Sequence, residues 1–206
     1  MFKRAEQLKS LFVFCHQDVR EFYELGCQVP VMDMSHDQDS TDLAKCLSYI
    51  DRHRGDISLQ GQRDAAISEP SSENDEEILV LGAMGGRLDH TLSNLNALYQ
   101  FRHLNITLWG EGNLVRLVRR GSCSIHPLRT VEGPSCGLVP LSGPAIASST
   151  GLKWNLYETR LEVGGLISTC NVMEAKEIYV TTDNDLLWMT TVAEDLACDD
   201  AVDLTD

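Results

Sequence analysis

The stretch ILVLGAMGGRLDHTLSNLNALYQF, residues 78–101, decides the fold class of this sequence. Its first four residues, 78–81, form a continuous apolar run, which is typical of a strand buried on both faces. Between residues 89 and 101, Leu92, Leu95 and Tyr99 recur on one side of a helix. A buried strand that runs through a glycine-rich turn into a helix is one half of a β-α-β unit. The stretch therefore predicts a parallel sheet covered by helices.

The residues before this stretch continue the same alternation. The pattern predicts a helix over residues 18–25, a strand over 28–34 and a helix over 41–53. Residues 18–105 are therefore predicted to form an α/β domain. The last helix has apolar residues at the spacing of one helix face, at Leu43, Cys46, Leu47 and Ile50.

After Leu104 the helical patterns stop and short strand patterns follow. They recur at intervals of roughly 8–12 residues and are separated by glycine turns, which is typical of an antiparallel sandwich or barrel. We expect a β-sandwich over residues 106–193. The predicted strands are residues 106–109, 114–118, 122–126, 136–140, 153–156, 178–182 and 186–191.

The composition excludes several classes of protein. With 206 residues, 43% of them hydrophobic and 23% charged, the chain is long enough for a folded core in one domain or two small ones. No apolar run approaches the ~18 residues of a membrane span, and the N-terminus, with only five apolar residues at 11–15, is a poor signal peptide. A formal charge of −14 repels phosphate backbones and argues against a nucleic-acid partner.

The seven cysteines are an odd number and contain no C-x-x-C pair, which disfavours a zinc site. They predict reduced, mostly buried thiols and hence a cytosolic protein. Two acidic segments are predicted to be exposed and without a regular fold. They are residues 61–77, with six acids and one base, and residues 194–206, with six acids and no base.

An acidic cluster, HDQDSTD at residues 36–42, comes directly before the predicted helix 41–53. Asp, Ser and Thr are favoured helix caps, and acidic residues there complement the helix dipole. One helix needs one cap, however. Clustered carboxylates at the edge of a sheet also suit Mg²⁺, which needs only one or two of them besides substrate phosphates. The pattern leaves both interpretations open.

The turn LGAMGGRLDH, residues 81–90, joins the buried strand to its helix. Gly85 and Gly86 allow a ligand to approach the backbone closely, and the helix N-terminus offers N–H groups to an anion. Arg87 adds donors that suit phosphate oxygens. The spacing is neither a dinucleotide fingerprint nor a P-loop. The structural alternative is a tight turn with a surface arginine and with Asp89 as the helix cap.

A third cluster lies in the β half, in SSTGLKWNL (residues 148–156) and GGLISTCN (residues 164–171). Small hydroxyl residues beside a tryptophan and an asparagine are able to line a pocket for a flat heteroaromatic ring. A tryptophan in a β-strand is more often part of the core, so the residues alone do not decide this point.

Taken together, these segments resemble the thiamine pyrophosphokinase family in its eukaryotic form. Five segments follow the family's order between residues 18 and 192. The resemblance implies an α/β ATP-binding catalytic domain over residues 18–105 and a β-sandwich thiamine-binding domain over 106–193. The segments are DQDSTDLAKC (37–46), GGRLDH (85–90), CGLVP (136–140), GLKWNL (151–156) and DNDLLW (183–188).

The activity that the resemblance implies is transfer of the pyrophosphoryl group of ATP to the hydroxyethyl oxygen of thiamine, with release of AMP and with Mg²⁺ spanning phosphate oxygens. It also implies a homodimer with thiamine sites between the α/β domain of one subunit and the β domain of the other. Asp39 and Asp42 become candidates for the metal and, with Arg87, for catalysis. The further candidates are Gln38, Thr41, Gly85, Gly86, Arg87 and Asp89 for ATP, and Trp154, Ser168 and Asn171 for thiamine.

The N-terminus departs from the family pattern. Family members carry a longer N-terminus and a Gly-Asp-x-Asp-Ser motif where this chain reads SLFVF, residues 10–14. We therefore expect residues 1–17 to be divergent and the parallel sheet to be incomplete. Since loss of one electrostatic stabiliser can cost roughly 10²–10³-fold in rate, we also expect impaired activity. The alternative is a non-catalytic homologue that still binds thiamine or dimerises. A milder departure is Cys170, which stands where the family has a serine.

Overall fold

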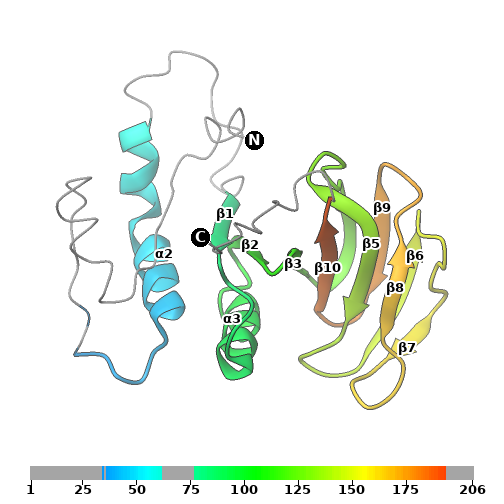
Figure 1. Cartoon of the computed structure of the whole chain (residues 1–206), viewed down its shortest axis with the longest axis horizontal. Coiled ribbons are helices and arrows are strands. Elements are labelled where there is room, and N and C mark those ends of the chain that lie inside the picture. The colour runs from blue at the N-terminus through cyan, green and yellow to red at the C-terminus, as the bar shows by residue number, and fades with distance from the viewer. Residues whose placement is uncertain (1–33, 35, 62–76, 194–206) are drawn as a thin grey trace, which may run out of the picture. The chain divides into compact units, whose positions relative to one another are not determined.

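The computed structural model describes residues 34, 36–61 and 77–193 (Figure 1). It divides into two compact units, residues 1–78 and 79–206, which are described one at a time. None of the described helices is long and apolar enough to cross a membrane. Several predictions fall outside the described residues: the stretch 1–17, the helix 18–25, residues 28–33 of the strand 28–34, residues 62–76 of the first acidic segment and the tail 194–206.

The described element of the first unit is helix α2, Asp42–Gly61. Its buried side chains include Leu43, Leu47 and Ile50, as the spacing of the apolar residues predicts. The helix extends beyond the predicted end at His53. At this residue the backbone leaves helical geometry, with φ −114° and ψ 15°, and a second helical segment follows the kink. The prediction ended at His53 because no apolar residue occurs between Ile50 and Ile57.

Ten strands and a helix make up the described part of the second unit (Figure 1). One sheet has the strand order β1-β2-β3-β10-β5-β8, and the other has the order β4-β9-β6-β7. The elements are β1 Glu77–Leu81, α3 Leu88–Gln100, β2 Asn105–Gly110, β3 Asn113–Val118, β4 Gly121–Ile125, β5 Glu132–Val139, β6 Ala145–Thr150, β7 Thr159–Leu161, β8 Ser168–Val172, β9 Ile178–Thr182 and β10 Leu186–Val192.

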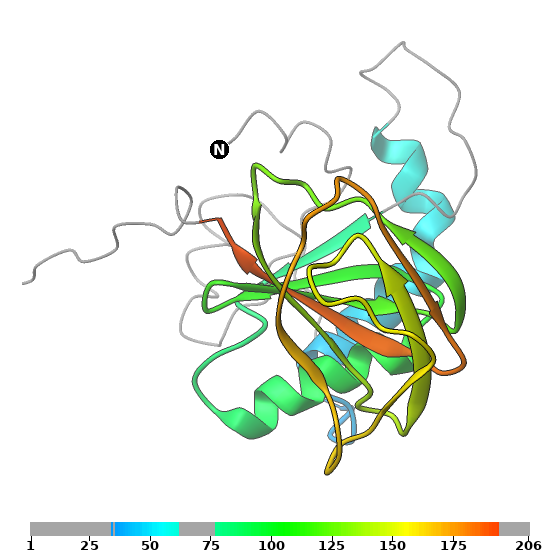
Figure 2. The same ribbon diagram turned by 90° about the vertical axis from the view of Figure 1, so that its right-hand side faces the viewer.

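Strands β1 and β2 and helix α3 form the β-α-β unit that residues 78–101 predict. The strands are neighbours in the sheet, and the Ala83 N–H donates to the Trp109 carbonyl at 3.0 Å. This bond joins the C-terminal ends of the two strands, so they run in the same direction. Helix α3 packs against β2 and β3 (Figure 2). The α/β part of the fold prediction is confirmed here.

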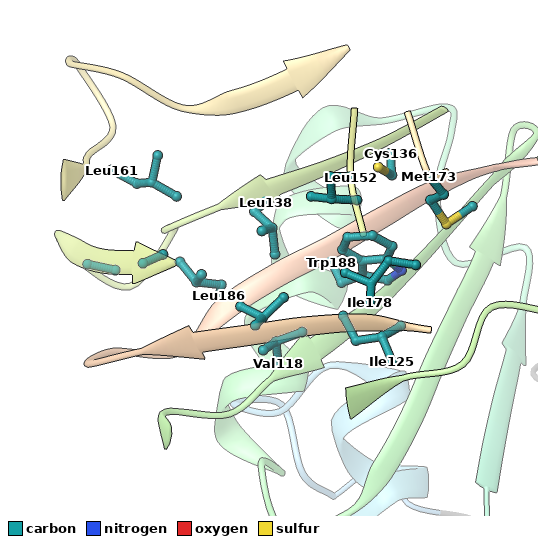
Figure 3. Packing of buried hydrophobic residues seen from close by; sticks show 13 residues of the cluster. Val118, Ile125, Cys136, Leu138, Leu152, Leu161, Met173, Ile178, Leu186 and Trp188 are labelled. Carbon is teal, nitrogen blue, oxygen red and sulfur yellow. The ribbon is translucent and has the colours of Figure 1, made fainter. Parts of the chain in front are cut away.

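The antiparallel sandwich is also confirmed. Its core lies between the two sheets, with Leu138, Leu186 and Trp188 from one sheet facing Leu161 and Ile178 from the other (Figure 3). All five side chains are at most 1% exposed. Strand β9 alternates buried and exposed residues, as expected for a strand with one face on a core.

Several predicted strands and strand boundaries were wrong. Residues 153–156 do not form a strand, whereas β6, β7 and β8 were not predicted and β5 begins at Glu132 instead of residue 136. In β6 the residues that face inward are small (Ala145, Ala147 and Ser149) while Ile146 is exposed. The usual alternation of large apolar and polar residues is therefore missing from the sequence.

A buried carboxylate ties three segments of the larger sheet together. Glu132 is 4% exposed and accepts hydrogen bonds from Arg116 Nη2 at 3.0 and 3.1 Å, from the Leu128 N–H at 2.9 Å and from Thr190 Oγ1 at 3.0 Å. Removal of such a group leaves buried donors without partners, which is far more costly than loss of an exposed ion pair.

We predict that Glu132→Ala lowers the free energy of unfolding by about 3 kcal/mol in urea denaturation. The matched control is Glu162→Ala, which removes an exposed pair with Arg160 at 3.1 Å and is expected to cost less than about 1 kcal/mol. Equal losses in the two variants would contradict the role assigned to Glu132.

Candidate functional site

The acidic cluster before α2 contains residues with a structural task and residues without one. Asp37 Oδ1 accepts the backbone N–H groups of Asp39 and Ser40, both at 3.0 Å. The hydrogen bonds from Ser40 are the main reason why the pKa of Asp37 lies below its ordinary value. Asp37 therefore shapes this turn.

Thr41 is the cap of α2. Its Oγ1 accepts the Ala44 N–H at 3.3 Å, and its carbonyl accepts the Lys45 N–H at 2.9 Å. Asp42 lies in the first helical turn with its side chain 93% exposed, and its carboxylate is 3.8 Å from Lys45 Nζ. The capping interpretation thus holds for Thr41 but not for Asp42.

The other members of the cluster, Gln38 and Asp39, are exposed. Asp39 takes part in the turn through its backbone N–H. Within the described residues its carboxylate has no hydrogen-bond or ion-pair partner, and the same residues contain no group of three or more His, Cys, Asp or Glu arranged to hold a metal. Asp39 and Asp42 are therefore the two carboxylates of this cluster that the local fold does not require.

The glycine loop in the second unit, which we define as residues 82–87, has a backbone that only glycine adopts easily. Gly85 has φ +108° and Gly86 has φ +63°. A Cβ on Gly85 would also lie 2.5 Å from the exposed Glu111 side chain, which would have to move.

Two side chains of α3 hold the glycine loop in place. Asn94 Nδ2 donates to the Ala83 carbonyl at 2.7 Å, and Thr91 Oγ1 accepts the Gly85 N–H at 3.3 Å. The sequence interpretation missed both residues, although a polar side chain on the side of a helix that follows a glycine turn was the available signal. The loop and the first turns of α3 therefore behave as one piece.

Arg87 occupies the cap position of α3 without a side-chain cap bond. Its guanidinium forms an ion pair with Asp89, with Nε 3.1 Å from Oδ1, and both side chains are mostly exposed. The mutual hydrogen bonds raise the pKa of Arg87 and lower the pKa of Asp89. Asp89 is thus a partner of Arg87, and the alternative interpretation, in which it caps the helix, is wrong because the helix already begins at Leu88.

In the sandwich, Asn171 and Trp154 contact each other directly. Asn171 is 3% exposed; its Oδ1 accepts the Trp154 N–H at 3.1 Å, and its Nδ2 donates to the Trp154 carbonyl at 2.7 Å. These side-chain bonds replace a strand partner, which explains why residues 153–156 are not a strand. Trp154 as a residue is 56% exposed, so it is not part of the core.

The Trp154 ring already has a cation on its face, because Lys153 Nζ lies 4.7 Å from the ring centroid. Ser168, the third predicted residue of this group, begins the edge strand β8 and pairs with Leu138. A bulge follows it, where Cys170 has φ +56° and is exposed.

The small hydroxyl residues near Trp154 support the surrounding loop. Ser149 Oγ accepts the Leu156 N–H and Ser148 Oγ accepts the Glu158 N–H, both at 2.9 Å. They hold the loop that displays Trp154.

The structure thus gathers the predicted residues into three local groups. Gln38, Asp39, Thr41 and Asp42 surround the start of α2 in the first unit. Gly85, Gly86, Arg87 and Asp89 form the start of α3 in the second unit, and Trp154 and Asn171 lie together in the sandwich.

Comparison with known proteins adds two matches to family models. Residues 15–109 match "Thiamin pyrophosphokinase, catalytic domain", and residues 122–187 match "Thiamin pyrophosphokinase, vitamin B1 binding domain". The glycine loop lies in the first match and Trp154 and Asn171 lie in the second.

Curated relatives carry the same name. The chain is 42% identical over 174 residues to thiamine pyrophosphokinase 1 of Oryza sativa subsp. japonica, covering 83% of this chain and 60% of the relative. It is 39% identical over 178 residues to thiamine pyrophosphokinase 1 of Arabidopsis thaliana, covering 85% and 61%. The chain therefore spans about three fifths of the length of these relatives.

Solved structures support the fold. Yeast thiamin pyrophosphokinase superposes with a TM-score of 0.68 at 20% identity, covering 88% of this chain and 67% of that one. The enzyme from Candida albicans gives a TM-score of 0.64 at 23% identity, covering 86% and 70%. With two matching family models that together extend over most of the sequence, the chain belongs to the thiamin pyrophosphokinase family.

Proposed function

We propose that this chain is a thiamine diphosphokinase, which transfers the pyrophosphoryl group of ATP to the hydroxyethyl oxygen of thiamine and releases AMP. The observation that carries the proposal is the start of α3, where a glycine loop leads into a helix that has no side-chain cap and displays an arginine. The N–H groups of a helix N-terminus bind anions, and this one lies in the part of the chain that matches the catalytic domain.

On the nucleotide side, Arg87 and the first turn of α3 would bind the phosphates. The ion pair with Asp89 uses Nε and Nη2 of Arg87, so Nη1 remains to donate to phosphate oxygens. Asp89 orients the guanidinium. Phosphoryl transfer depends mainly on positioning and on neutralising charge, which are the tasks of such a pair.

Asp39 and Asp42 would hold Mg²⁺. Both are exposed, and neither is needed to form the turn or to cap the helix. Two carboxylates with no third ligand suit a metal that completes its shell with water and substrate phosphates, as Mg²⁺ does. When bound, the ion would neutralise phosphate charge. Gln38 and Thr41 are proposed as polar contacts to the phosphates.

On the vitamin side, Trp154 would accept the aromatic cation of thiamine, with Ser168 as a polar contact and Asn171 as the residue that fixes Trp154. The ring face that now accommodates Lys153 Nζ at 4.7 Å shows that a cation fits against it. The net charge of −14 also favours a cationic ligand.

The proposal extends to a homodimer in the cytosol. Large apolar side chains are exposed on the sandwich, among them Tyr157, Val163 and Leu166, and a second copy would cover such residues. The four cysteines of the described residues are free thiols, in agreement with a reducing compartment. Light scattering of the purified chain measures whether it forms a dimer.

The first prediction concerns the reaction itself. Incubation of the 206-residue chain with ATP, Mg²⁺ and thiamine is expected to give thiamine diphosphate and AMP in equal amounts, at the reduced rate expected from SLFVF (residues 10–14) in place of the Gly-Asp-x-Asp-Ser motif. Liquid chromatography of the nucleotides and of the vitamin measures both products. Thiamine binding without AMP release would instead indicate the non-catalytic homologue.

The second prediction concerns Arg87. Arg87→Met is expected to lower kcat/KM for ATP by on the order of 10²-fold, because one electrostatic stabiliser is lost. Arg87→Lys retains part of the activity, since lysine keeps the charge but not the planar fork. Arg160→Met removes an exposed arginine from another ion pair and serves as the control. An equal effect of Arg87→Met and Arg160→Met would contradict the assignment.

The third prediction concerns Trp154. Trp154→Ala is expected to weaken thiamine binding by about 10-fold in calorimetry, and Trp154→Phe by less, because a smaller aromatic face remains. Lys153→Met is expected to tighten binding, since it removes a cation that competes for the ring. The control is Tyr179→Ala, an exposed aromatic in strand β9. Unchanged affinity in Trp154→Ala would show that thiamine binds elsewhere.

A further inference from the structure

Three turns of the second unit meet at the carboxylate of Asp185. Arg102, in the turn after α3, donates to it twice, from Nε to Oδ2 and from Nη2 to Oδ1, both at 2.9 Å. The backbone N–H of Arg120, in the turn between β3 and β4, donates to Oδ1 at 2.8 Å. Asp185 itself lies directly before β10 and is 8% exposed.

The carboxylate is ionised at neutral pH. Burial by itself raises the pKa of Asp185, but the hydrogen bonds from Arg102 and from the Arg120 N–H outweigh this effect, and the pKa lies below its ordinary value. Because the Arg102 guanidinium is bound to the Asp185 carboxylate by two hydrogen bonds, its orientation is fixed as well as its distance.

Arg119 also forms hydrogen bonds to the segment that follows α3. Its Nε donates to the Arg102 carbonyl, and its Nη2 donates to the Leu104 carbonyl and to Asn105 Oδ1, both at 3.1 Å. The backbone and the side chain of Arg102 are therefore held by different partners. The segment that follows α3 has little freedom to move relative to β3.

The two residues before Asp185 form hydrogen bonds to the sandwich. Asp183 Oδ1 accepts the Ile146 N–H of β6 at 2.7 Å, and Asn184 Nδ2 donates to the Pro144 carbonyl at 3.2 Å. The segment DNDLLW was singled out by its resemblance alone. In the structure its first three residues connect the sandwich, through β6, to the C-terminal end of α3.

The opposite end of α3 carries the glycine loop, which Asn94 and Thr91 attach to the helix. A helix of 13 residues is about 20 Å long, so a tilt of only about 3° about its C-terminal end moves its N-terminal end by about 1 Å. Misplacement of a binding group by about 1 Å can cost on the order of 10²-fold in rate.

We propose that Asp185 is a positioning residue, which fixes the direction of α3 through Arg102 and thereby places the glycine loop and Arg87 relative to the sandwich. The catalytic consequence rests on the function proposed above, whereas the structural consequence does not. Arg102 is 45% exposed, so solvent screening keeps the contribution of the ion pair to stability small, and its main effect is on geometry.

The test compares Arg102→Met and Arg102→Lys with Arg160→Met, which removes an exposed ion pair of the sandwich. In the 206-residue chain, amide hydrogen exchange measured by mass spectrometry is expected to accelerate in Arg102→Met along α3 and through residues 82–87. Exchange in β5, β6 and β9 stays as in the parent chain. Arg102→Lys is expected to show a smaller increase, and Arg160→Met none in α3.

Kinetics supply the second readout. Arg102→Met is expected to lower kcat by about 10- to 100-fold, while the calorimetric dissociation constant for thiamine changes less than twofold, because the vitamin-side residues are untouched. Faster exchange confined to residues 101–105 would overturn the proposal. So would an unchanged kcat in an active enzyme. If the parent chain makes no thiamine diphosphate, the proposed function fails, and the exchange data still decide whether Asp185 positions α3.

Discussion

The second unit depends on the placement of β10 between β3 and β5. Trp188 pairs with Arg116 of β3 on one side and with Leu138 of β5 on the other, and its indole is buried in the core between the sheets. In the order of the sheet, β3 is followed by β2 and β1 on one side of β10, and β5 is followed by β8 on the other side. Strand β10 therefore joins the β-α-β unit and the sandwich in one sheet. The apolar sequence Leu186-Leu187-Trp188 suits this central position, because all three side chains are buried there.

Around this framework, polar side chains divide into those that the fold uses and those that it leaves exposed. Glu132 and Asn171 are buried and bonded at several atoms, so they serve the structure. Arg87 and Trp154 stay exposed on loops that other residues hold in place, and Asp89 stays exposed in the first turn of α3. Rigid support beneath exposed functional groups is the arrangement that ligand binding requires, because it lowers the entropy lost when the ligand arrives.

Many of the helices and strands could be predicted from the sequence, and each wrong prediction has a physical reason. The strand and helix around the glycine loop were predicted because their apolar residues recur at clear periods. Strand β6 was missed because its inward residues are alanines and a serine. Residues 153–156 were predicted as a strand from the regular spacing of the strand patterns, but the Asn171 side chain bonds the Trp154 backbone there. Asp89 was considered as a cap, but the helix begins one residue before it. The roles of Asp39, Asp42 and Ser168 stay predictions.

The sequence alone determined the fold class, the order of the two halves and the family, because apolar periodicity and short motifs are properties of neighbouring residues. Only the tertiary structure decided which polar residues are occupied with holding the chain. Asp185 is separated from Arg102 by 83 positions and Asn171 from Trp154 by 17, so no local pattern brings either pair together. Such partners are chosen by the way the sheets pair and pack, and this depends on contacts between residues distant in the chain.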